Sequence, residues 1–266
     1  PKHYQGWRGT LFACEADAKD MALIARAQSF TPKILLTKQA TRNAVTKQLV
    51  SIASKLKRGD IFFLSYSGHG GQLPDVDGDE PDGKDETWCL YDGEFLDDEI
   101  FYYLGNFAEG ARILVLSDSC HSGTVLKEAL MLDAAQKTNP ARYRCMPPGI
   151  PLRVYQANKE FYDGIGRDSK HKDAAKKIKA SALLISGCQD NQLSQDGDFN
   201  GRFTGQLKLV WNGGKFQGNY LSFHKKITAQ MPPDQTPNLF RVGVRSPSFE
   251  REEPFTIEEP VQERKR

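Results

Sequence analysis

Two short apolar runs, each breaking into a small polar turn, constrain the fold of this chain more than any other feature. Residues 61–64 (Ile-Phe-Phe-Leu) lead into Ser-Tyr-Ser-Gly-His-Gly-Gly at 65–71, and residues 113–116 (Ile-Leu-Val-Leu) lead into Ser-Asp-Ser-Cys-His-Ser-Gly at 117–123. A continuous apolar run of this length is typical of a strand buried on both faces, as in parallel sheets. The sequence therefore predicts an α/β fold in which two buried strands end in chemistry-bearing turns.

The segment between these runs has the pattern of a crossover helix over residues 97–108. Its apolar face consists of Ile100, Leu104 and Phe107. Strand, helix and strand form a right-handed unit, so the two strands are expected to be parallel, with both turns at one sheet edge. His69 and Cys120 then come within hydrogen-bond reach, although about 50 residues separate them. A base beside a thiol raises its thiolate fraction, whereas a lone Cys is more often a small buried apolar residue.

Composition excludes several classes of protein. The chain of 266 residues carries a net charge of only +2, which gives no global field toward nucleic acid or membranes. It has no apolar run long enough for a membrane helix and no signal-peptide pattern at its start. Its five cysteines (14, 89, 120, 145 and 188) show no Cys-x-x-Cys spacing. This favours a reducing compartment over a disulfide framework or a zinc site, and predicts a cytoplasmic protein.

The two turns together resemble those of the metacaspases, the caspase-like cysteine peptidases of plants, fungi, protists and bacteria. The residues that carry the resemblance are Ser-Gly-His-Gly at 67–70 and Asp-Ser-Cys-His-Ser-Gly at 118–123, and it extends from about Gly9 to Gly243. A bacterial or type I-like member fits best. The resemblance implies a three-layer caspase-like sandwich with a mostly parallel central sheet. The family usually begins with an apolar strand, which residues 1–14 do not supply, so the strand count stays open.

The resemblance also implies an organisation of the chain. A peptidase domain is expected over residues 1–244, with a larger part at about 1–140, a basic connection at about 141–180 and a smaller part at about 181–244. Residues 245–266 would form a charged tail lying loosely over the surface. Metacaspases cut themselves after Lys or Arg in such a connection. A nucleic-acid patch there is the alternative, but it lacks aromatic residues interleaved as in a recognisable module.

Roles for the site residues follow in part from chemistry and in part from the resemblance. We expect Cys120 to attack a peptide carbonyl while His69 transfers protons, with backbone N–H groups at Cys120 and Gly70 holding the oxyanion. The family match places a substrate pocket at four positions: Cys14, Asp17, Ser67 and Asp118. Two carboxylates in a small pocket repel each other unless a cation enters, so the pocket should prefer Arg or Lys.

The acidic stretch at residues 75–99 raises the question of a metal. Asp75, Asp77, Asp79 and Glu86 match EF-hand positions, but Glu80 stands where the loop needs Gly, so an EF-hand is not expected. The resemblance points instead to a calcium site at Asp85, Asp97 and Asp98. A further aspartate of that family site is Lys127 here, which weakens it. A solvated acidic loop with a helix start at Asp97 is the alternative. The chemistry itself needs no cofactor, and calcium as an activator stays open.

The remaining pattern predicts further elements. Helices are expected over 15–29, 125–137 and around 203–211 and 220–231, and strands over 34–37, 182–186 and 239–244, with Thr41 capping a helix. The prolines at 140, 147, 148 and 151 predict an irregular stretch beyond residue 140.

The resulting hypothesis is a monomeric cysteine endopeptidase that cleaves proteins or peptides after Arg or Lys and processes itself, without nucleic-acid or membrane partners. A catalytically silent caspase-like scaffold or adaptor, and a relative cleaving after Asn or Asp, remain alternatives.

Overall fold

The central sheet brings together segments from the whole chain. The computed structural model describes residues 2–76, 78, 80, 83–120, 143–147, 149–189 and 192–257. The strand order is β1-β5-β6-β7. Their bounds are Ile61–Ser67, Arg112–Asp118, Ser181–Ser186 and Asn238–Gly243. β1, β5 and β6 run parallel, and β7 is antiparallel to β6. The predicted α/β class with a mostly parallel sheet is confirmed.

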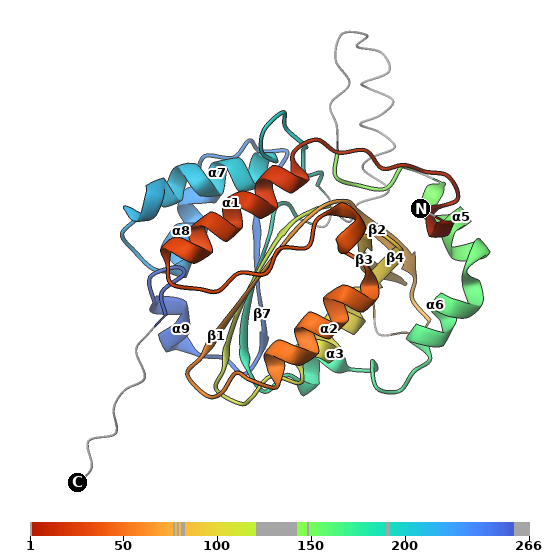
Figure 1. Ribbon diagram of the computed structural model, residues 1–266, viewed down its shortest axis with the longest axis horizontal. Helices are drawn as coiled ribbons and strands as arrows, with labels where there is room; N and C mark the ends of the chain where they lie inside the picture. Colours follow the sequence, from red (N-terminus) through yellow and green to blue (C-terminus); the bar gives the residue numbers. More distant parts are fainter. Residues whose placement is uncertain are drawn as a thin grey trace.

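Helices cover both faces of this sheet (Figure 1). α1 (Cys14–Ala27), α7 (Arg202–Trp211) and α8 (Tyr220–Thr228) lie on one face, and α2 (Arg42–Ala53) and α3 (Asp97–Leu104) on the other. Side chains of β5 alternate between the two cores. Leu114 and Leu116 pack with α1, α7 and α8, whereas Ile113 and Val115 pack with α2 and α3. This alternation makes β5 the buried strand that the sequence predicts.

A smaller antiparallel sheet continues directly from the end of β1. It consists of β2 (Gly70–Pro74), β3 (Lys84–Leu90) and β4 (Gly93–Leu96), in that order. α5 (Ile150–Ala157) and α6 (Lys159–Gly166) form beside it, within the stretch predicted to be irregular. That prediction is wrong because Pro151 occupies the first turn of α5, where its missing N–H is tolerated. The short 3-10 helices are η1 (Lys2–Tyr4), η2 (Thr37–Gln39), η3 (Ala174–Lys177) and η4 (Asn212–Gly214).

Other local predictions have mixed outcomes. The Thr41 cap is confirmed, since its Oγ1 accepts a hydrogen bond from the N–H of Ala44 at 3.2 Å. The strand expected at 34–37 is wrong: Thr37 has a φ of 41° and begins η2. An apolar cavity of about 490 Å³ lies between α1, α2, β1 and residues 29–35. The helix expected at 125–137 lies outside the described residues.

The segment after β7 is not a loose tail over its described length. α9 (Pro247–Arg251) packs against α8, and Phe249 and Phe255 are fully buried in the core beneath α7 and α8. The prediction is wrong because two aromatic side chains outweigh the surrounding charges. Across the described ranges, no helix has the length and apolar character needed to cross a membrane.

Candidate active site

The ends of β1 and β5 place the two polar turns side by side. The strands pair in parallel register, with Ser67 opposite Asp118 as the last pair. The N–H of Gly68 then donates to the carbonyl of Asp118 at 3.3 Å, which holds the turns together just past the sheet. His69 follows β1 and Cys120 follows β5, so both lie at the carboxyl edge, where open α/β sheets place their ligands.

A stretch of the chain itself, residues 143–146, lies extended along this edge. On one side Tyr143 forms an antiparallel bridge with Gln195, and on the other Cys145 forms a parallel bridge with Gly70. Strand-like pairing of this kind is how an extended peptide adds to the edge of a sheet. The segment is therefore held as an added strand between residues 70 and 195.

The backbone of Arg144 is held at both its polar groups. Its N–H donates to the carbonyl of Ser194 at 2.9 Å. Its carbonyl oxygen accepts two hydrogen bonds, from the N–H of Gly70 at 2.9 Å and from the N–H of Cys120 at 3.1 Å. Two backbone donors converging on one carbonyl beside a thiol-bearing residue have the geometry of an oxyanion hole.

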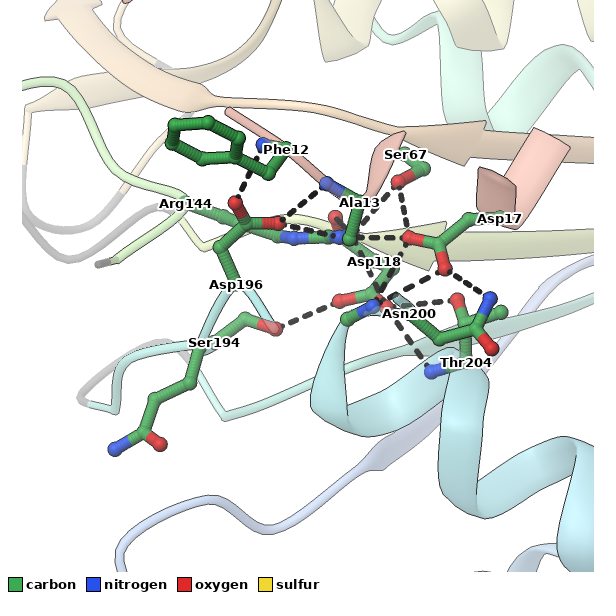
Figure 2. Close-up of polar contacts among 12 residues, drawn as sticks. Phe12, Ala13, Asp17, Ser67, Asp118, Arg144, Ser194, Asp196, Asn200 and Thr204 are labelled. Carbon is green, nitrogen blue, oxygen red and sulfur yellow. Dashed lines mark hydrogen bonds and ion pairs between the residues drawn. The ribbon is translucent and has the colours of Figure 1, made fainter. Parts of the chain in front are cut away.

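The side chain of Arg144 is buried among carboxylates (Figure 2). Its Nη1 donates to Ser67 Oγ at 2.7 Å and lies 3.1 Å from Asp118 Oδ2; its Nη2 lies 2.6 Å from Asp17 Oδ2 and 3.0 Å from Asp196 Oδ1. The side chain has no exposed surface. Burial alone would lower the pKa of the guanidinium, but Asp118 and Asp17 raise it overall, so the group stays charged.

Residues that follow β6 fix the pocket carboxylates. Asp118 Oδ1 accepts from Ser194 Oγ at 2.7 Å, and Asp118 Oδ2 accepts from the N–H and Oγ1 of Thr204 at 3.0 and 2.7 Å. Asp17 Oδ1 accepts from Asn200 Nδ2 at 2.9 Å. Burial raises the pKa of Asp17, and Arg144 acts in the opposite direction. The pocket is thus buried, hydrogen-bonded and acidic.

His69 is oriented by the segment before α1. Its Nε2 donates to the carbonyl of Gly9 at 3.1 Å, because a carbonyl only accepts, and the ring of Trp7 lies 4.7 Å from its own. Nδ1 is buried and has no hydrogen-bond partner. Burial lowers the pKa of His69 to about 4. At neutral pH the imidazole is therefore uncharged, with its proton on Nε2 and Nδ1 as the unprotonated nitrogen.

The thiols of the site are protonated in this arrangement. Cys120 is fully buried and clusters with Cys145 and Cys188. Burial, followed by a hydrogen bond with the Cys145 side chain, raises the pKa of Cys120 well above its usual value. Burial likewise raises the pKa of Cys14 to about 12, and Cys14 forms a hydrogen bond with Ser67. Cys120 packs against Cys145, the residue that follows Arg144.

Comparisons with known proteins agree with this geometry. A family model described as a caspase domain matches residues 1–251. The chain belongs to the caspase-domain family. It is 28% identical to Metacaspase-1A of Aspergillus oryzae over 79% of this chain and 57% of that protein, and 31% identical to Metacaspase-1 of Ajellomyces capsulatus over 79% and 67%. It therefore spans about half to two thirds of the length of these curated relatives.

A solved structure is also similar over nearly the whole length. The protein GSU0716 from Geobacter sulfurreducens is 58% identical, with a TM-score of 0.87, covering 97% of this chain and 95% of that one. Together with the family match, these relatives show that the chain is similar to the metacaspases within the caspase-domain family.

The metal residues predicted for this caspase-domain protein lie near one another, but the tightest group differs. Among the described residues, Glu80, Glu86 and Asp97 have carboxylate oxygens within 4.8 Å of one another. Asp85 and Asp98 are nearly buried beside them. Burial first, and then these four carboxylates, raise the pKa of Asp97 well above its usual value. Lys127 lies outside the described residues.

Sequence reasoning anticipated one wall of the pocket and missed the other. The structure gathers Cys14, Asp17, Ser67 and Asp118 around a single cation. Sequence reasoning did not assign a role in the site to six further residues: Gly9, Arg144, Ser194, Asp196, Asn200 and Thr204. A pattern at 194–204 was available, Ser-x-Asp-x-x-x-Asn-Gly-x-x-Thr, but nothing local distinguishes it from an ordinary polar loop.

Proposed function

We propose that this caspase-family peptidase is an endopeptidase that cleaves after basic residues, with Cys120 as nucleophile and His69 as proton carrier. We further propose that it cuts its own chain between Arg144 and Cys145. One observation carries both proposals: the Arg144 carbonyl accepts from the Gly70 and Cys120 N–H groups while its guanidinium fills the carboxylate pocket. A peptide bond that is cleaved after a basic residue would need both contacts at once, the carbonyl at the two N–H groups and the side chain in the carboxylate pocket.

In the proposed reaction, Cys120 Sγ attacks the carbonyl carbon of Arg144 and its proton passes to Nδ1 of His69. The carbonyl oxygen becomes an oxyanion, which the N–H groups of Gly70 and Cys120 stabilise. Nδ1 then delivers the proton to the nitrogen of Cys145, the C–N bond breaks, and an acyl-enzyme remains on Cys120. Water, deprotonated by His69, hydrolyses the thioester and restores the thiol.

Burial opposes the first proton transfer while residues 143–146 cover the site. It lowers the pKa of His69 and raises the pKa of Cys120, so the resting groups are a neutral imidazole and a neutral thiol. The attack therefore requires that water or a bound ion first shift these two pKa values toward each other. Removal of the 143–146 segment would expose both groups to water and move their pKa values back toward ordinary ones.

Self-cleavage also explains how a filled groove could turn over other proteins. While Arg144 occupies the pocket, a second peptide cannot enter. Cleavage frees Cys145 as a new amino terminus, and the bridge between Cys145 and Gly70 no longer ties the two halves of the groove. Substrates with a basic residue before the cut would then compete for the same carboxylates.

We also propose calcium as an activator, held by oxygens of Glu80, Glu86 and Asp97. The donor set fits, since Ca²⁺ takes oxygen ligands and the three residues place carboxylate oxygens within 4.8 Å of one another. The ion would bring positive charge to this acidic cluster. Isothermal titration with Ca²⁺, comparing wild type with Glu86→Gln, tests the site. Equal affinity in the two proteins would remove Glu86 from it.

The decisive experiment is incubation of the purified chain with and without calcium, followed by mass spectrometry and amino-terminal sequencing. We expect a product that begins at Cys145 in wild type, and none with Cys120→Ala or Arg144→Ala. Arg153→Ala, an exposed arginine on α5, should be cut normally. Cleavage that persists in Cys120→Ala would refute the nucleophile.

A peptide panel separates the alternatives. Peptides with Arg, Lys, Asn or Asp before the cut are given to the processed protein, and we expect turnover of Arg and Lys only. Turnover confined to Asn or Asp would overturn the pocket. A protein that cleaves neither itself nor any peptide, yet reacts with a thiol probe, would support the scaffold alternative. Cytoplasmic location and a monomeric state remain predictions, for fractionation and gel filtration to test.

A further inference from the structure

The pocket holds its guanidinium through both terminal nitrogens, and the two sides differ. Nη1 meets Ser67 Oγ at 2.7 Å, the Asp118 carbonyl at 3.0 Å and Asp118 Oδ2 at 3.1 Å. Nη2 meets two separate carboxylates, Asp17 at 2.6 Å and Asp196 at 3.0 Å. Each Nη2 hydrogen thus has an acidic acceptor of its own (Figure 2).

Asp196 is a built part of this pocket. Its side chain has no exposed surface. Its Oδ2 accepts from the N–H of Phe12 at 2.8 Å, and its Oδ1 accepts from the N–H of Ala13 at 3.4 Å, just before α1. Backbone donors fix the carboxylate in place before any cation arrives, so it is aimed at one point of the pocket.

The other carboxylates have more neutral partners than Asp196 has. Asp118 accepts three hydrogen bonds from neutral donors, one from Ser194 and two from Thr204, and Asp17 accepts three, from Ser67, Asn200 and the N–H of Gly201, whereas Asp196 accepts two. Asp196 therefore adds a third negative charge on the Nη2 side. A planar guanidinium spans both sides of the pocket, whereas a lysine ammonium is a single point that reaches only one.

We propose that Asp196 is a specificity-determining residue that makes the pocket prefer Arg to Lys. This rests on the proposed function, since it assumes that Arg144 lies where a substrate residue binds. With Lys, one buried carboxylate would lack its charged partner. With Arg, every carboxylate is engaged.

The test compares two peptides that differ only in Arg or Lys before the cut, using the self-processed full chain as wild type, Asp196→Asn and Asp234→Asn. We expect Asp196→Asn to lower kcat/KM for the Arg peptide and to change the Lys peptide far less, so that the Arg/Lys ratio falls about 10- to 100-fold. Asp234 is exposed, so Asp234→Asn should keep the wild-type ratio.

Two outcomes overturn the inference: an unchanged ratio in Asp196→Asn, or an equal loss for both peptides, which would mark a merely structural role. If Asp196→Asn processes itself poorly, binding can be measured instead of cleavage. Peptides that end in Arg or Lys should protect Cys120 from iodoacetamide, and the ratio of their protecting concentrations gives the Arg/Lys preference. Asp196→Glu, which keeps the charge, should retain more of the preference than Asp196→Asn. A wild type that cleaves neither peptide would instead refute the proposed function.

Discussion

Replacement of Arg144 by alanine should destabilise the chain strongly, because it leaves three buried carboxylates without their cation. The guanidinium has no exposed surface and contacts Asp17, Asp118 and Asp196 within 3.1 Å. Breaking a buried ion pair by removing one partner costs about 3–5 kcal/mol. We expect a loss of unfolding free energy of that size at pH 7.5, measured by urea denaturation. Both proteins carry Cys120→Ala, so that neither is cut.

The pH dependence of this loss tests its electrostatic origin. Burial already raises the pKa of Asp17 with Arg144 present, and loss of the cation should raise it further. A carboxyl whose pKa is higher in the folded than in the unfolded state binds more protons when folded, so the variant should lose stability as pH rises. Its deficit against the parent should therefore be smaller at pH 5 than at pH 8.

An internal control and a refuting result complete the design. Arg153→Ala, in the same background, removes an exposed arginine and should cost less than about 0.5 kcal/mol. A loss below about 1 kcal/mol for Arg144→Ala, or one independent of pH, would show that the carboxylates do not depend on this cation.

Three further predictions concern the thiol, the imidazole and a second buried acid. Peptide mapping by mass spectrometry should show Cys120 labelled by iodoacetamide more than about tenfold faster in Arg144→Ala than in wild type that mass spectrometry shows to be uncut, because the covering segment is released; equal rates would contradict this. His69→Ala should slow cleavage about 10²–10⁴-fold while the circular dichroism spectrum stays unchanged; full activity would remove His69 from the reaction. Burial raises the pKa of Glu94 to about 7 from 4.5, against the smaller opposing effects of Thr87 and Arg42, so stability should fall as pH rises across that range. Glu94→Gln should abolish this slope and add up to about 3 kcal/mol at pH 8, and an unaltered slope in urea titrations would exclude Glu94 as its source.

The local predictions that held began from patterns among neighbouring residues. The apolar run ending in Asp118 became a strand buried on both faces, and Thr41 capped α2 through its own side chain. The strand expected at residues 34–37 failed because a strand also needs a partner, and in the described part of the chain β1 pairs only with β5. Patterns within a few residues therefore predicted a strand correctly only where the tertiary structure supplied its partners, as β1 and β6 do for β5.

The candidate site divides in the same way. The sequence by itself determined that His69 and Cys120 follow buried strands, because hydrophobic periodicity is written in neighbouring residues. Only the tertiary structure decided which of many basic residues fills the acidic pocket, and that Asp196 closes it. Arg144 is chemically equivalent in sequence to Arg142 or Arg153. Its place depends on bridges to Gln195 and Gly70, contacts between segments far apart in the chain, which no local pattern encodes.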